Sequence, residues 1–557
     1  MSSPAPRKLN LLSLPPEIVD EIVTEIPSPK TLLALSKSSK SLAALVIPHH
    51  LYFRVIRASF LRSHLWERLA RDELHAANVH SLTVLKNDAD FPPLSPDEYD
   101  VAERLPPFPE SESEMGWEAG RPLARAQATF DIEIETMLVS ALRHMVHLNE
   151  FAWYREPSPI LTGEDDIWST LQRLKTVRNL DILDKPSGVN SNGPKKGIIF
   201  SDTFLRLSGF TTLKLHSSAL EDLDDEPDVT SLIDMLEHNC PDLESLSLSL
   251  QLYRHINTAS VSHLLSHTSW PRLHTLRLTN GLGCSSASLV QFLKAHPGIE
   301  ELVLGRMLPG RSWEEFGLAL HGAEEGAEDK PVLPRLKMLE CSSAQAAALL
   351  MRPIETLETL SGVEVHDTIA LDDYFSWDDE WEEEHAEDPE EDGSEPIPSP
   401  WRDQFLTRLR ACPSVRRLGV FNRAGADIRQ LDVLATVTPH LTRLDITVVA
   451  SDLPSDIDID HWCALYALFP SLHTIAAGHL VNLSPFYFHH MIQKNKDNIQ
   501  KLARACPRLK VLVSGDWKAV IISRDGVGKE GELARWVVRK VSESEEGGSN
   551  EEEIYGS

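Results

Sequence analysis

A short apolar triplet recurs along most of the chain. Each copy has an apolar residue, two free positions, a second apolar residue, one free position and a third apolar residue. Alternation of this kind is typical of a strand that buries one face. With 42% hydrophobic residues, ~41 such triplets arise by chance in 557 positions, so the triplet alone is weak evidence. We identify thirteen copies, whose first residues are Val79, Leu148, Val177, Phe210, Leu243, Leu273, Ile299, Leu336, Leu360, Val415, Leu441, Leu472 and Leu509.

Proline makes the repeat specific. Eight of the thirteen copies have a proline two positions before the first apolar residue, whereas 36 prolines in 557 residues predict about 0.8 by chance. A proline pushes the preceding residue out of the α region, so it ends a helix. These prolines are Pro241, Pro271, Pro297, Pro334, Pro413, Pro439, Pro470 and Pro507.

The segments that run into these prolines have the pattern of amphipathic helices. The clearest are 230–238, 288–296, 403–410 and 460–468, and each begins near a Ser, Thr or Asp that can cap it. Each repeat is therefore predicted to be a helix, an X-Pro turn and a short strand. At three turns the residue before proline is a cysteine, which we interpret as a small buried residue: Cys240, Cys412 and Cys506.

This pattern resembles the leucine-rich-repeat family, in its longer cysteine-containing form, from Val79 to Ser514. The resemblance implies an α/β solenoid, with a strand on one side of each repeat and a helix on the other. The irregular repeat length and the absence of asparagine at the strand ends depart from the tightest form of that family.

The N-terminal residues follow a different pattern, that of three short helices. Leu14 to Ile18 begins the first, Pro27–Ser28–Pro29 separates it from the second with Ser28 as its cap, and the third is expected to stop at Pro48. Such a short bundle has a marginal core of its own. We therefore expect it to need a partner or a flanking domain.

The string LPPEIVDEIVTEIPSPKTLLALSKSSKSLAALVIP resembles an F-box, with a fungal style of exit at His49–Tyr52. That resemblance implies docking on the Skp-type adaptor of a Skp–cullin–F-box ubiquitin ligase. Lys37 and Ser38 stand where the family usually has an apolar pair, which predicts weaker docking. The alternative is that the helices only cap the repeat array. By resemblance, the adaptor-binding ridge would consist of Leu14, Pro15, Pro16, Ile18, Leu32 and Leu33.

Composition changes interrupt the repeats. Asn87–Thr129 is rich in proline and acids, and Asp372–Glu395 holds fourteen acidic residues with no Lys or Arg, so both are expected to lack a core. The second is either a solvated insertion or a docking segment for a basic partner. The predicted organisation is an F-box-like domain at 9–56, a linker helix and first repeat at 57–86, a disordered insertion at 87–130, repeats at 131–371, an acidic disordered insertion at 372–400, repeats at 401–540 and an acidic tail at 541–557.

Charge and composition exclude several classes. Lys and Arg number 54 against 84 Asp and Glu, a net charge of −30, which argues against general binding to nucleic acid or anionic membranes. No apolar run approaches the ~20 residues of a membrane span. Met1–Leu11 lacks the apolar region of a signal peptide, and six cysteines without a CxxC pair fit neither a disulfide framework nor a zinc module. We expect a soluble protein of the cytoplasm, the nucleus or both.

Catalytic motifs are absent from the sequence. It contains no GxxxxGK[ST], HExxH, GxSxG or GxGxxG. The aspartates of 456–460 lack the glycine and distal glutamate of a calcium loop, and their place before a helix favours capping. We expect no catalytic residues, no metal and no cofactor.

The two resemblances together imply a substrate receptor. The F-box would bind the adaptor and, through it, the cullin scaffold, while the repeats hold an unknown target protein. The chain would act as one copy within a hetero-complex and would catalyse nothing itself. The alternative is a non-catalytic repeat scaffold without any ligase association.

Target binding is expected at the residues between the second and third apolar positions, because alternation points them outward. Lys214 and Arg277, with Arg272 and His274 nearby, would make one half of this face basic. We expect an acidic or phosphorylated segment to dock there; the alternative is an ordinary solvated surface. The outward residues include Lys214, Ser247, Arg277, Val303, Gly419 and Asp445.

Overall fold

The chain divides into two compact units, Met1–Ala259 and Ser260–Ser557, each described by itself. In this computed structural model, no helix among the described residues is both long and apolar enough to cross a bilayer. The structure describes residues 11, 14–24, 26, 28–86, 120–155, 158–184, 197–219, 228–250, 259–305, 312–322, 331–364, 400–422, 431–448, 459–476, 498–513, 518–522 and 536–540.

The first unit begins with the three predicted helices, α1 (Pro16–Thr24), α2 (Pro29–Ser38) and α3 (Lys40–Val46). Ser28 caps α2 by accepting a hydrogen bond from the Thr31 N–H at 3.4 Å. The prediction that helical structure stops at Pro48 is wrong. The helix α3 ends at Val46, and Pro48 lies in a π-helical turn, Ile47–Leu51, that follows it directly. The helices pack on a small shared core of Val19, Val23, Leu32, Leu42 and Val46.

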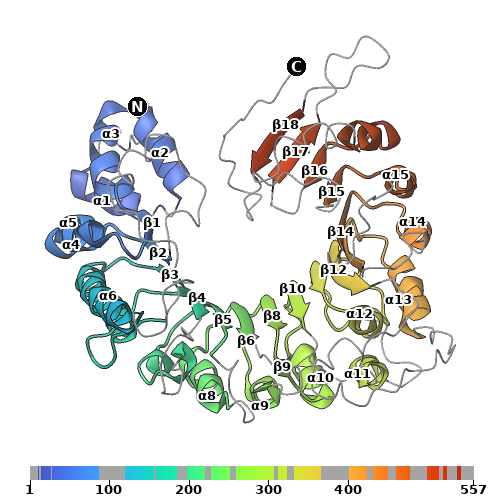
Figure 1. The fold of residues 1–557 in the computed structure, drawn as a ribbon, viewed down its shortest axis with the longest axis horizontal. Coiled ribbons are helices and arrows are strands. Elements are labelled where there is room, and N and C mark those ends of the chain that lie inside the picture. Colours follow the sequence, from blue (N-terminus) through green and yellow to red (C-terminus); the bar gives the residue numbers. More distant parts are fainter. Residues whose placement is uncertain are drawn as a thin grey trace, which may run out of the picture. The chain divides into compact units, whose positions relative to one another are not determined.

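The rest of the first unit is a parallel sheet with strands in chain order and helices on one face (Figure 1). Each strand continues the backbone ladder of the previous one. The strands are β1 (Val55–Ser59), β2 (Ser81–Leu85), β3 (Glu150–Tyr154), β4 (Asn179–Asp184), β5 (Thr212–Ser217) and β6 (Ser245–Leu250). The helices are α4 (Ser63–Arg71), α5 (Glu73–Ala77), α6 (Gly120–Leu142), α7 (Ile167–Leu174) and α8 (Thr230–Asn239), with short 3₁₀ turns at Ile198–Phe200 and Phe204–Arg206.

The second unit repeats the arrangement and ends in two antiparallel strands, β17 (Lys518–Ile522) and β18 (Trp536–Lys540). Its parallel strands are β8 (Thr275–Thr279), β10 (Glu301–Leu304), β11 (Met338–Glu340), β12 (Thr359–Glu364), β13 (Arg417–Asn422), β14 (Arg443–Val448), β15 (Thr474–Ala476) and β16 (Val511–Val513). Its helices are α9 (Ser262–His267), α10 (Ser286–Ala295), α11 (Ser312–His321), α12 (Ser343–Leu349), α13 (Pro400–Arg410), α14 (Asp432–Val437), α15 (Ile459–Ala467) and a further helix at 498–505; β7 (Ala259–Ser260) and β9 (Leu282–Gly283) are two-residue strands.

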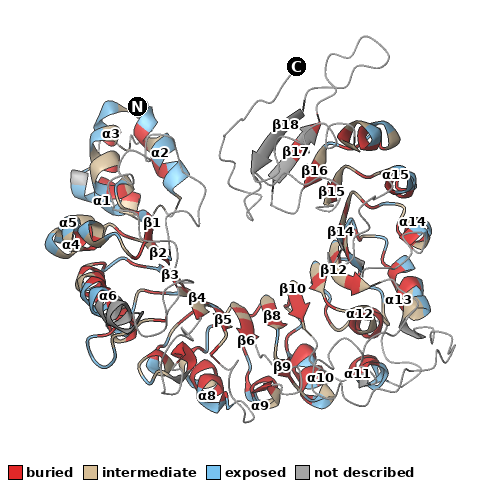
Figure 2. Ribbon diagram, in the orientation of Figure 1, coloured by how far each residue is buried: buried red, intermediate tan, exposed pale blue. Residues whose placement is uncertain are grey.

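The apolar triplets form the core, as predicted. Leu180, Leu213 and Leu246 stand in register on successive strands of the first unit and are fully buried. Leu302 and Leu339 do the same in the second unit. Figure 2 shows buried residues, in red, along the strands. The prediction of a leucine-rich-repeat type of α/β solenoid is confirmed.

Two predicted boundaries are wrong. Val55–Ser59 is the first strand of the sheet and pairs with β2, although it carries no triplet with a preceding proline. The helix α6 begins at Gly120, inside the segment 87–130 that was predicted to be disordered. Residues 87–119, 372–395 and 541–557 lie outside the described residues, so those predictions stay predictions.

The triplet assigned to Leu360 is also in the wrong frame. Leu360 pairs with Leu339, which is a second apolar position, so the first position of this repeat is the buried Leu357. The expected third position is Gly362, where the ladder shifts between Leu360 and Val363. Because Gly362 occupies the third position, the triplet that begins at Leu357 is not apolar throughout. The sequence pattern therefore indicated the triplet that begins three residues later, at Leu360.

Gly362→Ala is expected to destabilise the second unit by about 1–3 kcal/mol, because φ at this position is +80° and an added Cβ lies 3.1 Å from the Cys341 carbonyl oxygen. Urea unfolding measures the loss. Gly298→Ala is the control, since its Cβ meets nothing closer than 3.7 Å. Equal effects of the two changes would contradict the strained bulge.

Candidate functional site

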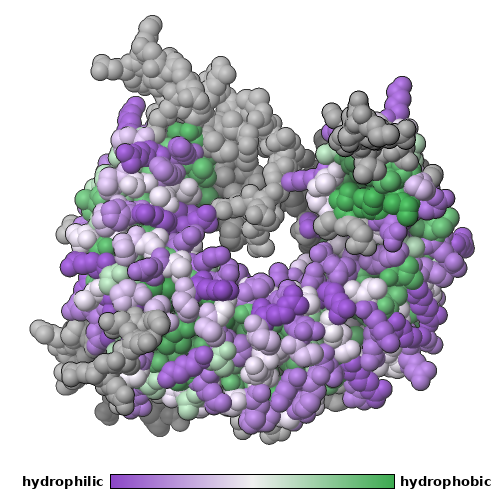
Figure 3. Space-filling view, turned by 180° about the vertical axis from the view of Figure 1, so that it is seen from behind, coloured by the Kyte–Doolittle hydropathy of each residue, from purple (hydrophilic) through white to green (hydrophobic). Residues whose placement is uncertain are grey.

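The N-terminal module exposes large apolar side chains that its own core does not need. Ile18 and Ile22, one turn apart on α1, are 43% and 39% exposed, and Leu33 on α2 is 43% exposed. Pro15 at the start of α1 is exposed as well. Figure 3 shows hydrophobic residues gathered on the surface of this module. An apolar group of this kind on a small module is typical of a protein-binding surface.

The predicted ridge residues differ in how far they are exposed. Ile18 and Leu33 lie on the surface as predicted, and Pro16 begins α1. Leu14 is half-buried against the module core. The prediction for Leu32 is wrong: its side chain is fully buried, because α2 turns Leu32 toward Leu42 and leaves its sequence neighbour outside. Ile22 was missed, although its spacing of four from Ile18 places the two on one helical face.

A buried arginine links the module to the first repeat. The Arg54 guanidinium, from the residue before β1, donates to the carbonyl oxygens of Thr24 and Ile26 at 3.2 and 2.6 Å, at the end of α1. His50 Nε2 lies 2.7 Å from Asp20 Oδ1 on the same helix. Burial lowers the pKa of Arg54. These contacts fix α1, and hence its exposed isoleucines, to the start of the sheet.

His80 lies beside this junction, near Arg54 and two other histidines. His80 precedes β2, and its ring stacks on the His147 ring with centroids 5.8 Å apart. The backbone N–H of His80 donates to the Arg54 carbonyl oxygen at 2.9 Å. Burial, followed by the charges of Arg54, His147 and His50, lowers the pKa of His80 to about 4. The folded protein therefore favours the neutral form of the His80 ring.

Outward residues of neighbouring strands stand in register. Lys214 stands in register with Ser247 in the first unit, and Arg277 with Val303 in the second. The sequence therefore predicted correctly which residues share a row. Lys214 and Arg277, however, belong to different units.

Two expectations for this row are wrong. Lys214 Nζ lies 3.7 Å from Asp181 Oδ2, and Arg277 Nε donates to Glu301 at 2.5 Å, so both predicted cations face a carboxylate of the adjacent strand. Val303 is only 4% exposed. It stands between the longer side chains of Arg277 and Glu340 in the register, which we interpret as covering it.

Asp445 also has a partner, which reduces its use as a free contact. Both of its oxygens accept from Arg443 Nε at 2.9 Å, two residues earlier on β14. Gly419 stands in register with Asp445. Ser247 is half-buried. The polar residues among the predicted outward positions are thus accessible to a partner protein. The charged ones, however, each face an opposite charge within the chain.

Two buried carboxylates in the first unit accept hydrogen bonds from residues outside their own helix or strand. Glu135 of α6 accepts from the N–H groups of Ile160 and Leu161 at 2.8 and 3.0 Å. Asp184, at the end of β4, accepts from Ser217 Oγ at 2.7 Å and from the Ile198 N–H at 2.9 Å. Burial raises the pKa of both groups. Their oxygens are occupied by donors, so we interpret both as structural.

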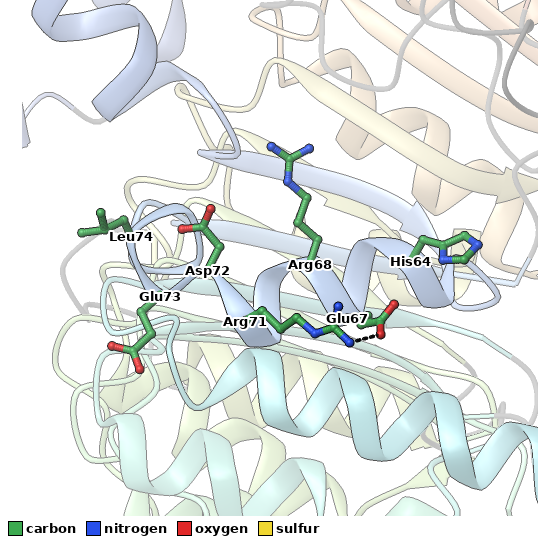
Figure 4. A pocket seen from close by; sticks show the side chains of 7 residues that line it. All are labelled: His64, Glu67, Arg68, Arg71, Asp72, Glu73 and Leu74. Carbon is green, nitrogen blue, oxygen red and sulfur yellow. Dashed lines mark hydrogen bonds and ion pairs between the residues drawn. The ribbon is translucent and has the colours of Figure 1, made fainter.

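A surface depression of about 610 Å³ lies over α4 and α5 (Figure 4). Arg71 pairs with Glu67 at 2.5 Å, whereas Arg68 and Glu73 point in opposite directions. Asp72 caps α5 by accepting from the His75 N–H at 3.2 Å. Within the described ranges, no group of three or more His, Cys, Asp or Glu is placed to hold a metal ion.

The cysteines before the prolines are buried, as predicted: Cys240, Cys412 and Cys506. Burial raises the pKa of the Cys240 thiol to about 11. The thiol is therefore protonated at neutral pH, which suits a packing residue better than a nucleophile or a metal ligand.

Comparisons with known proteins do not identify a family for this chain. No family model matches the sequence, and none of the curated proteins matches it. Among solved structures, the chain is similar to a chain in the crystal structure of the Rad7 and Elc1 complex in yeast, at 12% identity and a TM-score of 0.37, over 79% of this chain and 92% of that one.

His80→Gln is expected to flatten the pH dependence of stability between about pH 6.5 and 4. In this pH window His80 binds a proton in the unfolded chain but stays neutral in the folded protein. The free energy of unfolding therefore falls as the pH falls. One half-buried group contributes a slope below about 1.4 kcal/mol per pH unit. Urea unfolding at a series of pH values measures it, with His64→Gln, at an exposed position on α4, as control. An unchanged slope in His80→Gln would contradict the assignment.

Proposed function

We propose that this protein is the substrate-recognition subunit of a Skp–cullin–F-box type ubiquitin ligase. The N-terminal module binds an Skp-type adaptor, the adaptor joins it to the cullin scaffold, and the strand faces hold a target protein. The chain itself is a binding protein without catalysis, and it works in the cytoplasm, the nucleus or both.

The observation that carries the proposal is the apolar surface of the module. Ile18, Ile22 and Leu33 stay exposed while the module's core is complete without them. Burying each of them against a partner is worth about 1.5–3 kcal/mol at most. The F-box-like sequence from Leu14 to Pro48 agrees in chemistry with an adaptor as that partner.

The repeats support the second half of the proposal. In each unit the helices lie on one face of the sheet (Figure 1). The other face presents rows of half-exposed polar residues in fixed register, for example Asp181 beside Lys214. Rows held at regular spacing on a rigid sheet are the usual binding surface of repeat proteins.

Replacing Ile18 and Leu33 together with Ser is expected to weaken adaptor binding at least about tenfold, because two apolar contacts are lost. Binding of purified full-length chain to purified Skp-type adaptor, measured by surface plasmon resonance, tests this. Both side chains are more than a third exposed, so the fold should survive, as circular dichroism would verify.

Leu318→Ser with Leu468→Ser is the matched control, since these leucines of the second unit are 47% and 46% exposed. The control is expected to bind the adaptor as tightly as the unchanged chain. The proposal fails if the unchanged chain does not bind any Skp-type adaptor, or if the module variant binds as well as the control.

A further inference from the structure

A buried arginine joins the end of α1 to the start of the sheet in the first unit. Arg54, the residue before β1, is 3% exposed. Its guanidinium donates to the carbonyl oxygens of Thr24 and Ile26 at 3.2 and 2.6 Å. Its own carbonyl oxygen accepts from the backbone N–H groups of His80 and Ser81 at 2.9 and 3.1 Å, where β2 begins. One residue therefore contacts the N-terminal module on one side and the second strand on the other.

This contact supplies what the sequence of α1 lacks. The last carbonyl groups of a helix have no partner within the helix and carry partial negative charge, so a cation near them is favourable. The last turn of α1 contains no basic residue. The helix has nine residues, and helices of this length are marginal without contacts from outside. Arg54 provides the missing cation from the start of the sheet.

Stability alone does not explain an arginine at this place. Burial lowers the pKa of Arg54 because the charged guanidinium loses water, and among the described residues its Nε has no acceptor. An apolar side chain often fills such a site at no loss of stability. A second buried arginine of the same unit, Arg155, pairs instead with the carboxylate of Asp131 at 2.5 Å. We interpret the role of Arg54 as the orientation that it imposes on α1.

That orientation sets the place of the exposed isoleucines. The valines of α1 are buried in the module core, while Ile18 and Ile22 are 43% and 39% exposed. Ile22 lies two residues before Thr24, whose carbonyl oxygen accepts from Arg54. An apolar surface that is held in place before its partner arrives avoids the free-energy cost of ordering on binding. Release of the end of α1 would therefore affect the binding surface directly.

We propose that Arg54 is a positioning residue for adaptor binding, which holds α1 so that Ile18 and Ile22 meet the adaptor in one fixed orientation. The proposal rests on the adaptor-binding function put forward above. Arg54 is buried and acts on the adaptor only through α1. The N-terminal module is therefore complete as a binding surface only when it is joined to the first strand.

The test is Arg54→Met in the full chain, which removes the charge and keeps a long side chain. It is expected to raise the Kd for a purified Skp-type adaptor about tenfold, measured by surface plasmon resonance, because α1 must then be ordered on binding. In the free chain, hydrogen–deuterium exchange is expected to become at least about tenfold faster in Pro16–Thr24 and to stay unchanged in β3 to β6. Arg54→Lys, which keeps a cation with N–H donors, is expected to bind the adaptor more tightly than Arg54→Met.

Arg155→Met is the matched control, because Arg155 is 5% exposed and lies in the same unit, directly after β3. Removing its guanidinium breaks a buried ion pair with Asp131, so the urea midpoint of the chain is expected to fall. The adaptor Kd and the exchange of Pro16–Thr24 are expected to stay as in the unchanged chain. The control separates a loss of stability from a loss of position.

Two results would overturn the proposal. An adaptor Kd of Arg54→Met equal to that of the unchanged chain would show that the isoleucines are in place without Arg54. Equal rises in Kd for Arg54→Met and Arg155→Met would make the effect a general loss of stability. Failure of the unchanged chain to bind any Skp-type adaptor would instead overturn the proposed function, and exchange of Pro16–Thr24 in the free chain would still decide whether Arg54 holds α1.

Discussion

Each repeat depends on its neighbours, because one short strand cannot bury its apolar residues alone. Leu213 reaches zero exposure only between Leu180 and Leu246, which stand in register on the strands at its two sides. At ~25 cal/mol per Å² of apolar surface, this stacking is the main source of stability in a solenoid. The prolines matter because, in the repeats that carry them, they end the helix where the next strand must begin.

This constraint acts on only one side of the sheet. The inward residues must be apolar, but the outward residues are free to vary, and their chemistry differs from place to place. Lys214 stands beside the oppositely charged Asp181, whereas Arg417 stands in register with a second arginine, Arg443. The N-terminal module obeys the same rule on a smaller scale: it buries Val23 and Leu32 and leaves Ile18 outside.

Much of the fold could be predicted from the sequence, because inward leucines and helix-ending prolines are both visible there. The strand β1 could not, since it has no proline signal, and Gly362 hid the frame of β12 because a bulge needs a glycine where a leucine was expected. The site was harder. Spacing placed Lys214 correctly in its row, but its partner Asp181 lies on another strand and appears only when the strands pair.

Hydrogen–deuterium exchange on the full chain, with and without purified Skp-type adaptor, tests the central claim most directly. Exchange reports on backbone protection along the whole chain, so it locates the contact without choosing a residue in advance. The account predicts that the adaptor slows exchange in Pro16–Thr24 and Pro29–Ser38 and leaves the strands of the second unit unchanged. Protection confined to the strand faces, or no protection anywhere at saturating adaptor, would contradict it.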